Sequence, residues 1–593
     1  MKSSVINVAP YSLLPVALLL SVVLIQTSRC YGQTEDQKQS PSSTRRAGLV
    51  EPAQPASSDA SHDGTTSTTP SAPPAKAAEP GVPAEITREL ELMKARIEEL
   101  ESQLKTRAAG DQGATASSAV PATAEFASSP SAEAVIQPQS DSSSAQAAAP
   151  STPAVDTQTP FAYADWTWLN GTARNKDAVW DSKFFTPEIR FDTHFVSSFN
   201  HPKDDTIDGS SEIFRSNEIQ AEQISFGGDF HWQNVRGRVL TMFGMFAVTT
   251  PRNDASTGRG QWGNNSPQDM RNAYRYVSEA YGGYHFDVNH GLNVDAGIFV
   301  SYIGLFSYYN FDNWAYQPSY VSSNTPWFFN GLRIQWFPTN KLKIEPWIIN
   351  GWQSYARFGN KPGLGGQILW RPKPWLSLVF NNYGMGEDTL GLIGRSRIHT
   401  DDSVEVKYYD RPEKTLDKMA FSLTGDLGCE YGGGAACFGD KKDASGNITA
   451  HKQAFLGWMA YNRFWFNHDK YGLTIGGGQI NNPGRYLTLV PPINGADAIS
   501  GTPYFTANPG DPFKAWDASL TFDYMPRQYI TFRSEYGYRH ANVPYFVGRG
   551  GITPPGGNTG TPSQPVILPG GSTWQPDLRK DEAAVRLAIM VKF

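Results

Sequence analysis

The tightest grouping of residues that could act together in catalysis is the stretch RIHTDDS, which contains His399, Asp401 and Ser403. A relay of serine, histidine and acid needs the histidine within hydrogen-bond reach of both partners. In an extended segment, residues two apart point the same way and lie about 7 Å from each other, which does not order such a relay. With no other nucleophile motif, we assign no catalytic residues and expect no enzyme activity.

One glycine pattern of the dinucleotide-binding type occurs, GRGQWG at residues 258–263. That fingerprint binds a pyrophosphate only between a strand and the start of a helix. Here it lies in a polar loop with no helical pattern after it. The sequence therefore implies no cofactor.

Two of the three cysteines, Cys429 and Cys437, flank a glycine-rich stretch in CEYGGGAAC. No histidine and no second cysteine pair lies close by, so a metal site is a poor interpretation. In an oxidising compartment, a local disulfide is the expected outcome.

Ionisable residues recur on one face of segments whose residues alternate between polar and apolar. Such a face cannot form a dry core, because unpaired buried charges cost too much free energy, so we expect it to line water. The candidate lining residues are Arg190, Asp192, His194, Arg275, Glu279, Arg397, His399, Asp401, Glu405, Lys407, Arg533 and Glu535. Rings of charge can set ion selectivity, but both signs are mixed here, and a salt-bridged, hydrated wall without strong preference is the plainer alternative.

An aromatic stretch, LFSYYNFDNWAYQPSYVSSNTPWFF, follows one of these segments and is the third of the long loops. We expect it to fold inward and narrow a pore, with rings on which sugars could stack. The constriction residues are Tyr308, Tyr309, Phe311, Asp312, Trp314, Tyr316 and Tyr320. Packing of loop against loop and contact with a neighbouring protomer are the alternatives.

Sixteen segments have strand character, and tight turns alternate with long polar loops between them. This arrangement, with an even number of strands, is typical of outer-membrane β-barrels. Closure of the sheet also satisfies the backbone groups in lipid. We therefore predict an all-β transmembrane antiparallel barrel of about 16 strands (range 14–18). The predicted strands span residues 187–199, 225–232, 235–248, 274–288, 292–304, 327–337, 342–352, 364–370, 375–383, 395–410, 417–428, 453–466, 471–481, 514–525, 528–540 and 583–593.

Two features of the apolar faces favour lipid over a soluble core. Tryptophans cluster at segment ends, as interfacial girdles require, at Trp232, Trp327, Trp336, Trp352, Trp370 and Trp375. The chain also ends in the alternating strand DEAAVRLAIMVKF. Its terminal aromatic residue, Phe593, fits the signal that such barrels present to the barrel-assembly machinery.

The part of the chain before the barrel is predicted to be exported and mostly unstructured. Residues 1–32 resemble a signal peptide, because the apolar run LLPVALLLSVVLI is too short to span a membrane. Residues 33–82 and 108–160 have linker composition and are expected to be disordered. Residues 161–186 are either a lead-in or a plug of the lumen, and 187–593 form the barrel. A mean hydropathy of -0.43 excludes a multi-helix membrane protein.

Between the linkers, residues 83–107 have a heptad pattern that predicts a periplasmic coiled coil. Its seam residues are Leu90, Met93, Ile97, Leu100 and Leu104. A lone amphipathic helix is the alternative. If the coil forms, the chain assembles as a homo-oligomer, for which we favour a trimer. The net charge of -6 gives no indication of nucleic-acid binding.

Several stretches carry a resemblance to a known family. They include FAYADWTWLNG, FFTPEIRFDTHFVSSFNHPKD, TPWFFNGLRIQWFPTNKLKIEPWIINGW and HTDDSVEVKYYDRPEK. Over residues 161–593, the chain resembles the OmpL-like putative β-barrel porin family. The resemblance implies a porin-like barrel in the outer membrane of a Gram-negative bacterium. A barrel of about sixteen strands can hold an aqueous channel, so we expect it to pass small hydrophilic solutes by diffusion. A carbohydrate-selective porin and an adhesion barrel without transport are the alternatives.

Overall fold

A computed structural model describes Lys94 and, in the unit Ser142–Phe593, residues 155–207, 213–252, 270–323, 325–357, 361–386, 394–437, 439–482, 513–552, 566–567, 570–574 and 577–593. Lys94 is helical and exposed. The signal peptide, both linkers (except residues 155–160) and the rest of the predicted coil lie outside the described residues. The fold reported below is that of the unit Ser142–Phe593.

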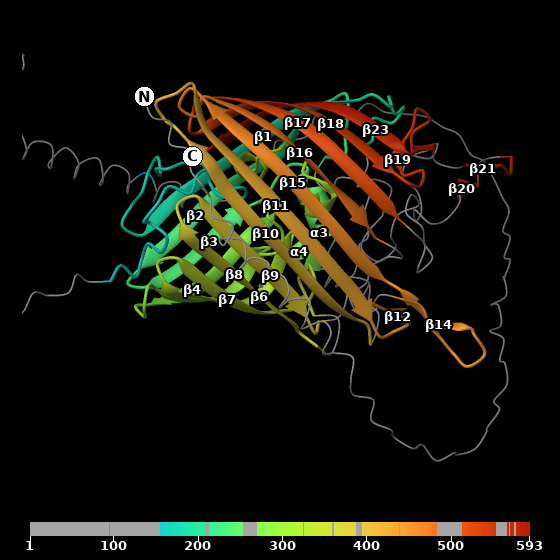
Figure 1. The fold of residues 1–593 in the computed structure, drawn as a ribbon, viewed down its shortest axis with the longest axis horizontal. Coiled ribbons are helices and arrows are strands. Elements are labelled where there is room, and N and C mark those ends of the chain that lie inside the picture. Colours follow the sequence, from blue (N-terminus) through green and yellow to red (C-terminus); the bar gives the residue numbers. More distant parts are fainter. Residues whose placement is uncertain are drawn as a thin grey trace, which may run out of the picture. The chain divides into compact units, whose positions relative to one another are not determined.

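Sixteen antiparallel strands close into a barrel (Figure 1), which confirms the predicted fold class. In order around the barrel they are β1 (Phe185–Ser198), β2 (Ile219–Trp232), β3 (Val235–Thr241), β4 (Val277–Phe286), β5 (Leu292–Val300), β6 (Phe328–Thr339), β7 (Leu342–Ile349), β8 (Gly363–Lys373), β9 (Leu376–Gly384), β10 (Ser396–Asp410), β11 (Leu416–Tyr431), β15 (Ala454–Phe466), β16 (Tyr471–Asn481), β17 (Lys514–Arg527), β18 (Ile530–Ala541) and β23 (Asp581–Lys592). β23 pairs with β1 and closes the barrel.

The alternation in sequence becomes two unlike faces of one sheet. On β18, Arg533 and Glu535 are buried inside the barrel, whereas Phe532 before them and Tyr536 after them are 40% and 45% exposed. Successive side chains of a strand point to opposite faces, so a single strand satisfies both environments. The same pattern holds on β23, where Arg586 is buried and Leu587 is exposed.

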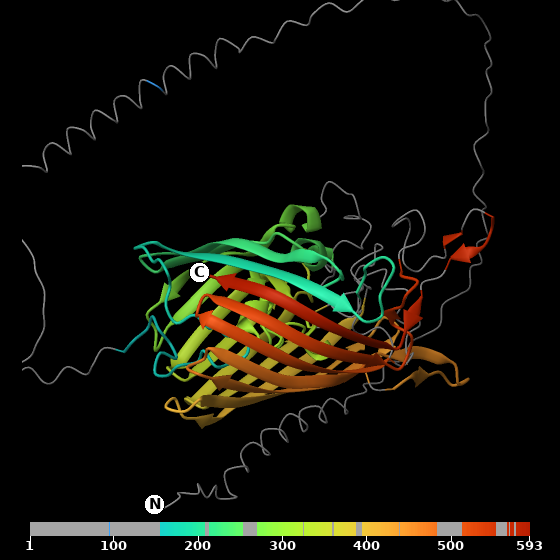
Figure 2. The same cartoon turned by 90° about the horizontal axis from the view of Figure 1, so that it is seen from above.

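Short turns join the strands at one end of the barrel and long loops at the other. At the short-turn end, Gln233 and Asn234 between β2 and β3 both have positive φ, 48° and 68°, the conformation of a tight hairpin turn. The carboxyl terminus lies at this end, as does the segment that leads into β1 (Figure 2). An even number of strands explains this placement.

Short helices interrupt the long loops, although no helix was predicted after residue 161. They are α3 (Phe246–Arg252), α4 (Met270–Tyr274), the 3-10 turn η5 (Asn310–Asp312) and α5 (Tyr320–Ser323). The strand predicted over 235–248 is therefore too long, because β3 ends at Thr241. No helix in the described part of the chain is long and apolar enough to cross a membrane.

Two tryptophans assigned to the girdles lie elsewhere. Trp327 and Trp352 are buried among other aromatic rings, whereas Trp232, Trp370 and Trp375 are exposed as a girdle requires. A strand end alone does not distinguish a ring that faces lipid from one that turns into the loops.

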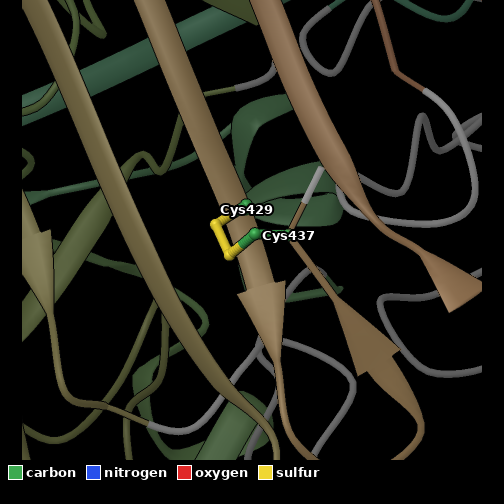
Figure 3. Close-up of a disulfide and its surroundings, with 2 residues drawn as sticks. All are labelled: Cys429 and Cys437. Carbon is green, nitrogen blue, oxygen red and sulfur yellow. A yellow bond between two sulfur atoms is a disulfide. The ribbon is translucent and has the colours of Figure 1, made fainter. Parts of the chain in front are cut away.

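The loop after β11 carries a small sheet outside the barrel. It contains β12 (Ala435–Ala436), β13 (Lys441–Lys442) and β14 (Ile448–Lys452). A disulfide joins Cys429 near the end of β11 to Cys437 in this loop (Figure 3). Two further small sheets pair β19 (Phe546–Val547) with β22 (Leu578–Arg579) and β20 (Val566–Ile567) with β21 (Thr573–Trp574).

Candidate functional site in the barrel lumen

The loop between β5 and β6, residues 301–327 and hereafter the third loop, contacts the inner wall of the barrel. It enters beside β9 and β10, where the Tyr302 hydroxyl donates a hydrogen bond to the carbonyl oxygen of Asn382 (2.7 Å). The backbone N–H of Gly304 donates to Asp401 Oδ1 (3.3 Å). The loop is thus anchored to the wall from its first residues.

The middle of the third loop contacts β1. Asp312 forms an ion pair with Arg190, with 2.9 Å between Oδ2 and the guanidinium nitrogen. Asn310 donates a hydrogen bond to Asp192 Oδ2 (3.0 Å), and the Tyr316 hydroxyl donates to Asp192 Oδ1 (2.8 Å). All of these side chains are buried, so the contacts exclude water from this part of the wall.

The last part of the third loop contacts β17 and β18. Both oxygens of Glu535 accept hydrogen bonds from backbone N–H groups, those of Tyr316 (2.6 Å) and Gln317 (2.9 Å). Asp517 Oδ2 accepts from Ser319 Oγ (2.8 Å) and from the N–H of Tyr320 (3.0 Å). Carboxylates on the wall therefore hold the loop through its backbone donors.

Arg533 holds the same part of the loop through its carbonyl groups. The guanidinium donates to the carbonyl oxygens of Asn310 (3.2 Å), Asn313 (2.8 Å) and Ala315 (3.0 Å). It also pairs with Asp523, which lies between Arg533 and Arg463 at 2.6 and 2.7 Å. This arrangement satisfies groups that would otherwise be buried without partners.

The predicted constriction residues all lie in this loop, and their side chains are buried rather than displayed to a solute. Trp314, Tyr316 and Tyr320 are 2% exposed or less. Trp314 packs edge-on against Trp465 of β15, with ring centroids 5.6 Å apart. The remaining members, Tyr308, Tyr309 and Phe311, belong to hydrophobic clusters with residues of the wall and the other loops.

Apart from Arg275, the predicted wall residues fall into two groups. Those that contact the third loop are Arg190, Asp192, His194, Glu279, Asp401, Arg533 and Glu535. The others have partners elsewhere on the wall or on the segment before β1. Arg397 pairs with Glu430 (2.6 Å), and Lys407 pairs with Asp410 (2.6 Å).

Arg275 does not belong to the wall. It lies in the turn between α4 and β4, is exposed, and its guanidinium rests over the ring of Tyr276. The strand that was predicted to start at residue 274 starts at Val277, so the alternation was extended too far.

The residues of RIHTDDS do not assemble a relay. His399 Nε2 faces Asp426 Oδ1 at 2.7 Å, whereas Ser403 Oγ bonds to Thr424 Oγ1 at 2.8 Å. Both partners lie on the neighbouring strand β11. Within the described residues, no cluster of three or more histidine, cysteine or acidic side chains suits a metal ion.

Sequence reasoning missed part of the wall that holds the loop. The missed residues that contact the loop are Tyr461, Arg463, Asp517 and Arg539, whereas Asp523, Glu582 and Arg586 pair with other charges of the wall. Alternation on β15, β17, β18 and β23 marks them as inward-facing, so the signal was present. The alternation does not show which of the inward-facing side chains contact a loop.

Around the third loop, the charged side chains of the wall are buried, and the lining of water by these faces stays a prediction. The burial of charge is offset by opposite charges on neighbouring strands and by polar groups of the third loop. Paired charges of both signs, such as Arg463, Asp523 and Arg533, agree with the salt-bridged wall that was the plainer alternative.

The segment before β1 also contacts the lumen wall. The N–H of Asn170 donates to Glu405 Oε1 on β10 (2.8 Å), and its side-chain amide donates to Ser422 Oγ on β11 (2.9 Å). Trp168 is 1% exposed, and its carbonyl accepts a hydrogen bond from Trp314 Nε1 of the third loop (3.2 Å). Residues 161–176 are referred to below as the inner segment.

Two further residues of the inner segment contact the third loop. Gly171 has φ of +66°, and a Cβ there would lie 2.6 Å from the carbonyl oxygen of Leu305, so only glycine allows this approach. The guanidinium of Arg174 lies 4.2 Å from the ring centroid of Phe311 and donates to Thr531 Oγ1 of β18 (2.9 Å).

At the short-turn end, a cavity of about 720 Å³ lies between the chain before the inner segment and the turns of the barrel. Its lining includes Thr157, Gln158, His231, Arg236 and Asn293. Beside it, hydrogen bonds from the Thr159 side chain and backbone and from the Gln158 backbone lower the pKa of Asp156 below its ordinary value. This mouth of the barrel carries both polar and aromatic side chains.

The family model described as "Putative beta-barrel porin-2, OmpL-like" matches residues 191–567, which is well over half of the chain. The chain belongs to this family. The predicted resemblance is thereby confirmed, and with it a porin-like barrel of the Gram-negative outer membrane. A member of this porin family presents its short turns to the periplasm and its long loops to the outside.

Solved outer-membrane proteins are similar to this porin-family barrel at low identity. The outer membrane channel DcaP of Acinetobacter baumannii is 12% identical, with a TM-score of 0.36, over 70% of this chain and 100% of that chain. The anion-selective porin from Comamonas acidovorans is 10% identical, with a TM-score of 0.36, over 69% and 99%. The trimer form of OmpT of Vibrio cholerae is 8% identical, with a TM-score of 0.37, over 70% and 100%. We base no argument on likeness at this level. No curated protein matches the sequence.

Proposed function

We propose that this barrel is a channel for small hydrophilic solutes whose lumen is narrowed by the third loop and, at the periplasmic side, by the inner segment. The observation that carries the proposal is the anchoring of the third loop to opposite parts of the wall. Its contacts run from Asp401 on β10 to Arg190 on β1 and Glu535 on β18. A loop fixed at so many points restricts the path of a solute.

The aromatic residues of the loop support a constriction made by packing. Because Trp314, Tyr316 and Tyr320 are buried, their rings stabilise the loop by packing. They are not exposed as surfaces on which sugars could stack. The carbohydrate-selective alternative is less well supported for this reason. Because the wall carries paired charges of both signs, we propose weak ion selectivity.

The inner segment supports the plug interpretation of residues 161–186. Phe161, Trp166, Trp168 and Leu169 belong to the same hydrophobic cluster as Trp314 and wall residues. A lead-in that stayed in the periplasm would not bury these side chains. Passage of solutes therefore requires the inner segment, the third loop or both to move.

Conductance of the purified full chain in planar bilayers tests the proposed function. We expect discrete current steps that are small for a barrel of sixteen strands, because both segments obstruct the lumen. A folded barrel, shown by heat-modifiable migration on a gel, that gives no steps at any applied voltage would contradict the channel and favour the adhesion alternative.

We also propose that the chain is a homo-oligomer, with a trimer favoured, held in part by the predicted coil. An Ile97→Asp substitution places a charge in the centre of the predicted seam and is expected to reduce the mass of the oligomer in mild detergent. Glu98→Asp, outside the seam, is the matched control. An oligomer of unchanged mass in the Ile97→Asp variant would show that the coil does not assemble it.

The carboxyl terminus supports recognition by the barrel-assembly machinery. The backbone of Phe593 exchanges two hydrogen bonds with Ile189 of β1, and its ring is 47% exposed. The terminal ring is thus accessible on the outside of the barrel while its backbone closes the sheet.

A further inference from the structure

The outward face of β10 carries an acidic side chain among apolar ones. Asp401 is buried inside the barrel, so the next residue, Asp402, is on the outward face. Along the same face, Ile398 is 50% exposed on one side of Asp402, and Val404 and then Tyr408 (51% exposed) follow on the other. A carboxylate within this apolar band is unfavourable against lipid.

Asp402 differs from the other ionisable side chains at outward positions of the described strands. Those lie at strand ends, where water is available. Lys514 begins β17, and His540 near the end of β18 pairs with Asp581 at the start of β23 (2.7 Å). Asp402 has at least two outward apolar residues between it and the turn that follows β10.

Two polar side chains and an exposed glycine adjoin Asp402 within the otherwise apolar outward face. Thr400 Oγ1 donates a hydrogen bond to Asp402 Oδ2 (3.1 Å), and Thr400 is opposite the exposed Asn382 of β9. Gly425 of β11 is opposite Asp402, and a Cβ added to it would meet nothing within 4 Å. We name Asn382, Thr400, Asp402 and Gly425 the outer polar patch.

We propose that the outer polar patch is the surface on which a second copy of this chain docks. In the membrane interior, amide, hydroxyl and carboxylate groups find their hydrogen-bond partners on protein, and a glycine allows the partner to come close. The heptad pattern of residues 83–107 identifies the occupant, since a parallel coil of identical chains brings their barrels side by side in one orientation. The inference goes beyond the channel proposal, because each barrel conducts through its own lumen.

A matched pair of glycine substitutions tests the position of this surface. Gly425→Trp is expected to block the close approach of the second copy and to lower, by several degrees or more, the temperature at which the full-length oligomer dissociates on a gel. The control is Gly282→Trp, at an exposed outward glycine of β4 where an added Cβ also meets nothing within 4 Å. Equal effects of the two substitutions, no effect of Gly425→Trp, or an oligomer containing another protein would overturn the proposal.

Asp402→Leu is expected to have different effects on thermal stability at a docking surface and at a surface that faces lipid. At a docking surface, loss of the carboxylate is expected to lower the dissociation temperature of the oligomer. Against lipid, leucine is the better residue, so the barrel would unfold at a higher temperature with the oligomer unaffected, and that result would overturn the proposal. Heat-modifiable migration shows that each variant folds. If the conductance per channel is unchanged while the oligomer result contradicts the docking surface, this inference fails and the channel proposal stands.

Discussion

Deletion of residues 156–176 is expected to raise the single-channel conductance several-fold. The deletion removes the inner segment, whose Trp168 and Asn170 contact the third loop and the walls at β10 and β11. The lumen then loses the obstruction on its periplasmic side, and the third loop loses a packing partner. Conductance in planar bilayers at one salt concentration measures the change.

A deletion of equal length within the linker, residues 121–141, is the control for shortening the chain before the barrel. It is expected to leave the conductance unchanged. If both deletions have the same effect, the change arises from the shorter tether and not from the emptied lumen. If the 156–176 deletion folds and conducts like the full chain, the inner segment does not obstruct the path.

Substitution of Arg533 by methionine is expected to release the third loop and to produce larger, noisier openings. Arg533 donates to three backbone carbonyls of the loop and pairs with Asp523. Removing one partner of a buried ion pair costs about 3–5 kcal/mol. Each carbonyl left without a donor adds about 1–3 kcal/mol, although these costs are not additive. The loop is therefore expected to leave its anchored position for part of the time.

Arg333→Met is the matched control, because Arg333 pairs with Asp295 on the wall at 2.9 Å and, in the described part of the chain, hydrogen-bonds to no third-loop residue. This variant is expected to lose stability without a change in channel noise. Similar noise in both variants would mean that a weakened wall, and not a released loop, alters the current.

The sequence predicted the strands better than the loops for a physical reason. Each strand is constrained locally, because its outward side chains contact lipid and are apolar, whereas its inward side chains are mostly polar. Tyr471–Asn481 was therefore predicted with the bounds that the structure has. No such constraint acts on Phe246–Arg252, a helix whose first three residues were predicted to end a strand. Arg275 was also wrongly assigned to the lumen, because the predicted strand included residues that precede the first residue of β4, Val277.

The sequence by itself determined the barrel, the number of its strands and, within most of the strands, which side chains face inward, because lipid and the need to pair every backbone group leave one arrangement. Only the tertiary structure decided what fills the lumen. Asp312 and Arg190 are 122 residues apart in sequence, and Trp314 and Trp168 are 146 apart. No local pattern encodes such contacts, since they arise when closure of the sheet brings a loop and an inner segment to walls formed by distant strands.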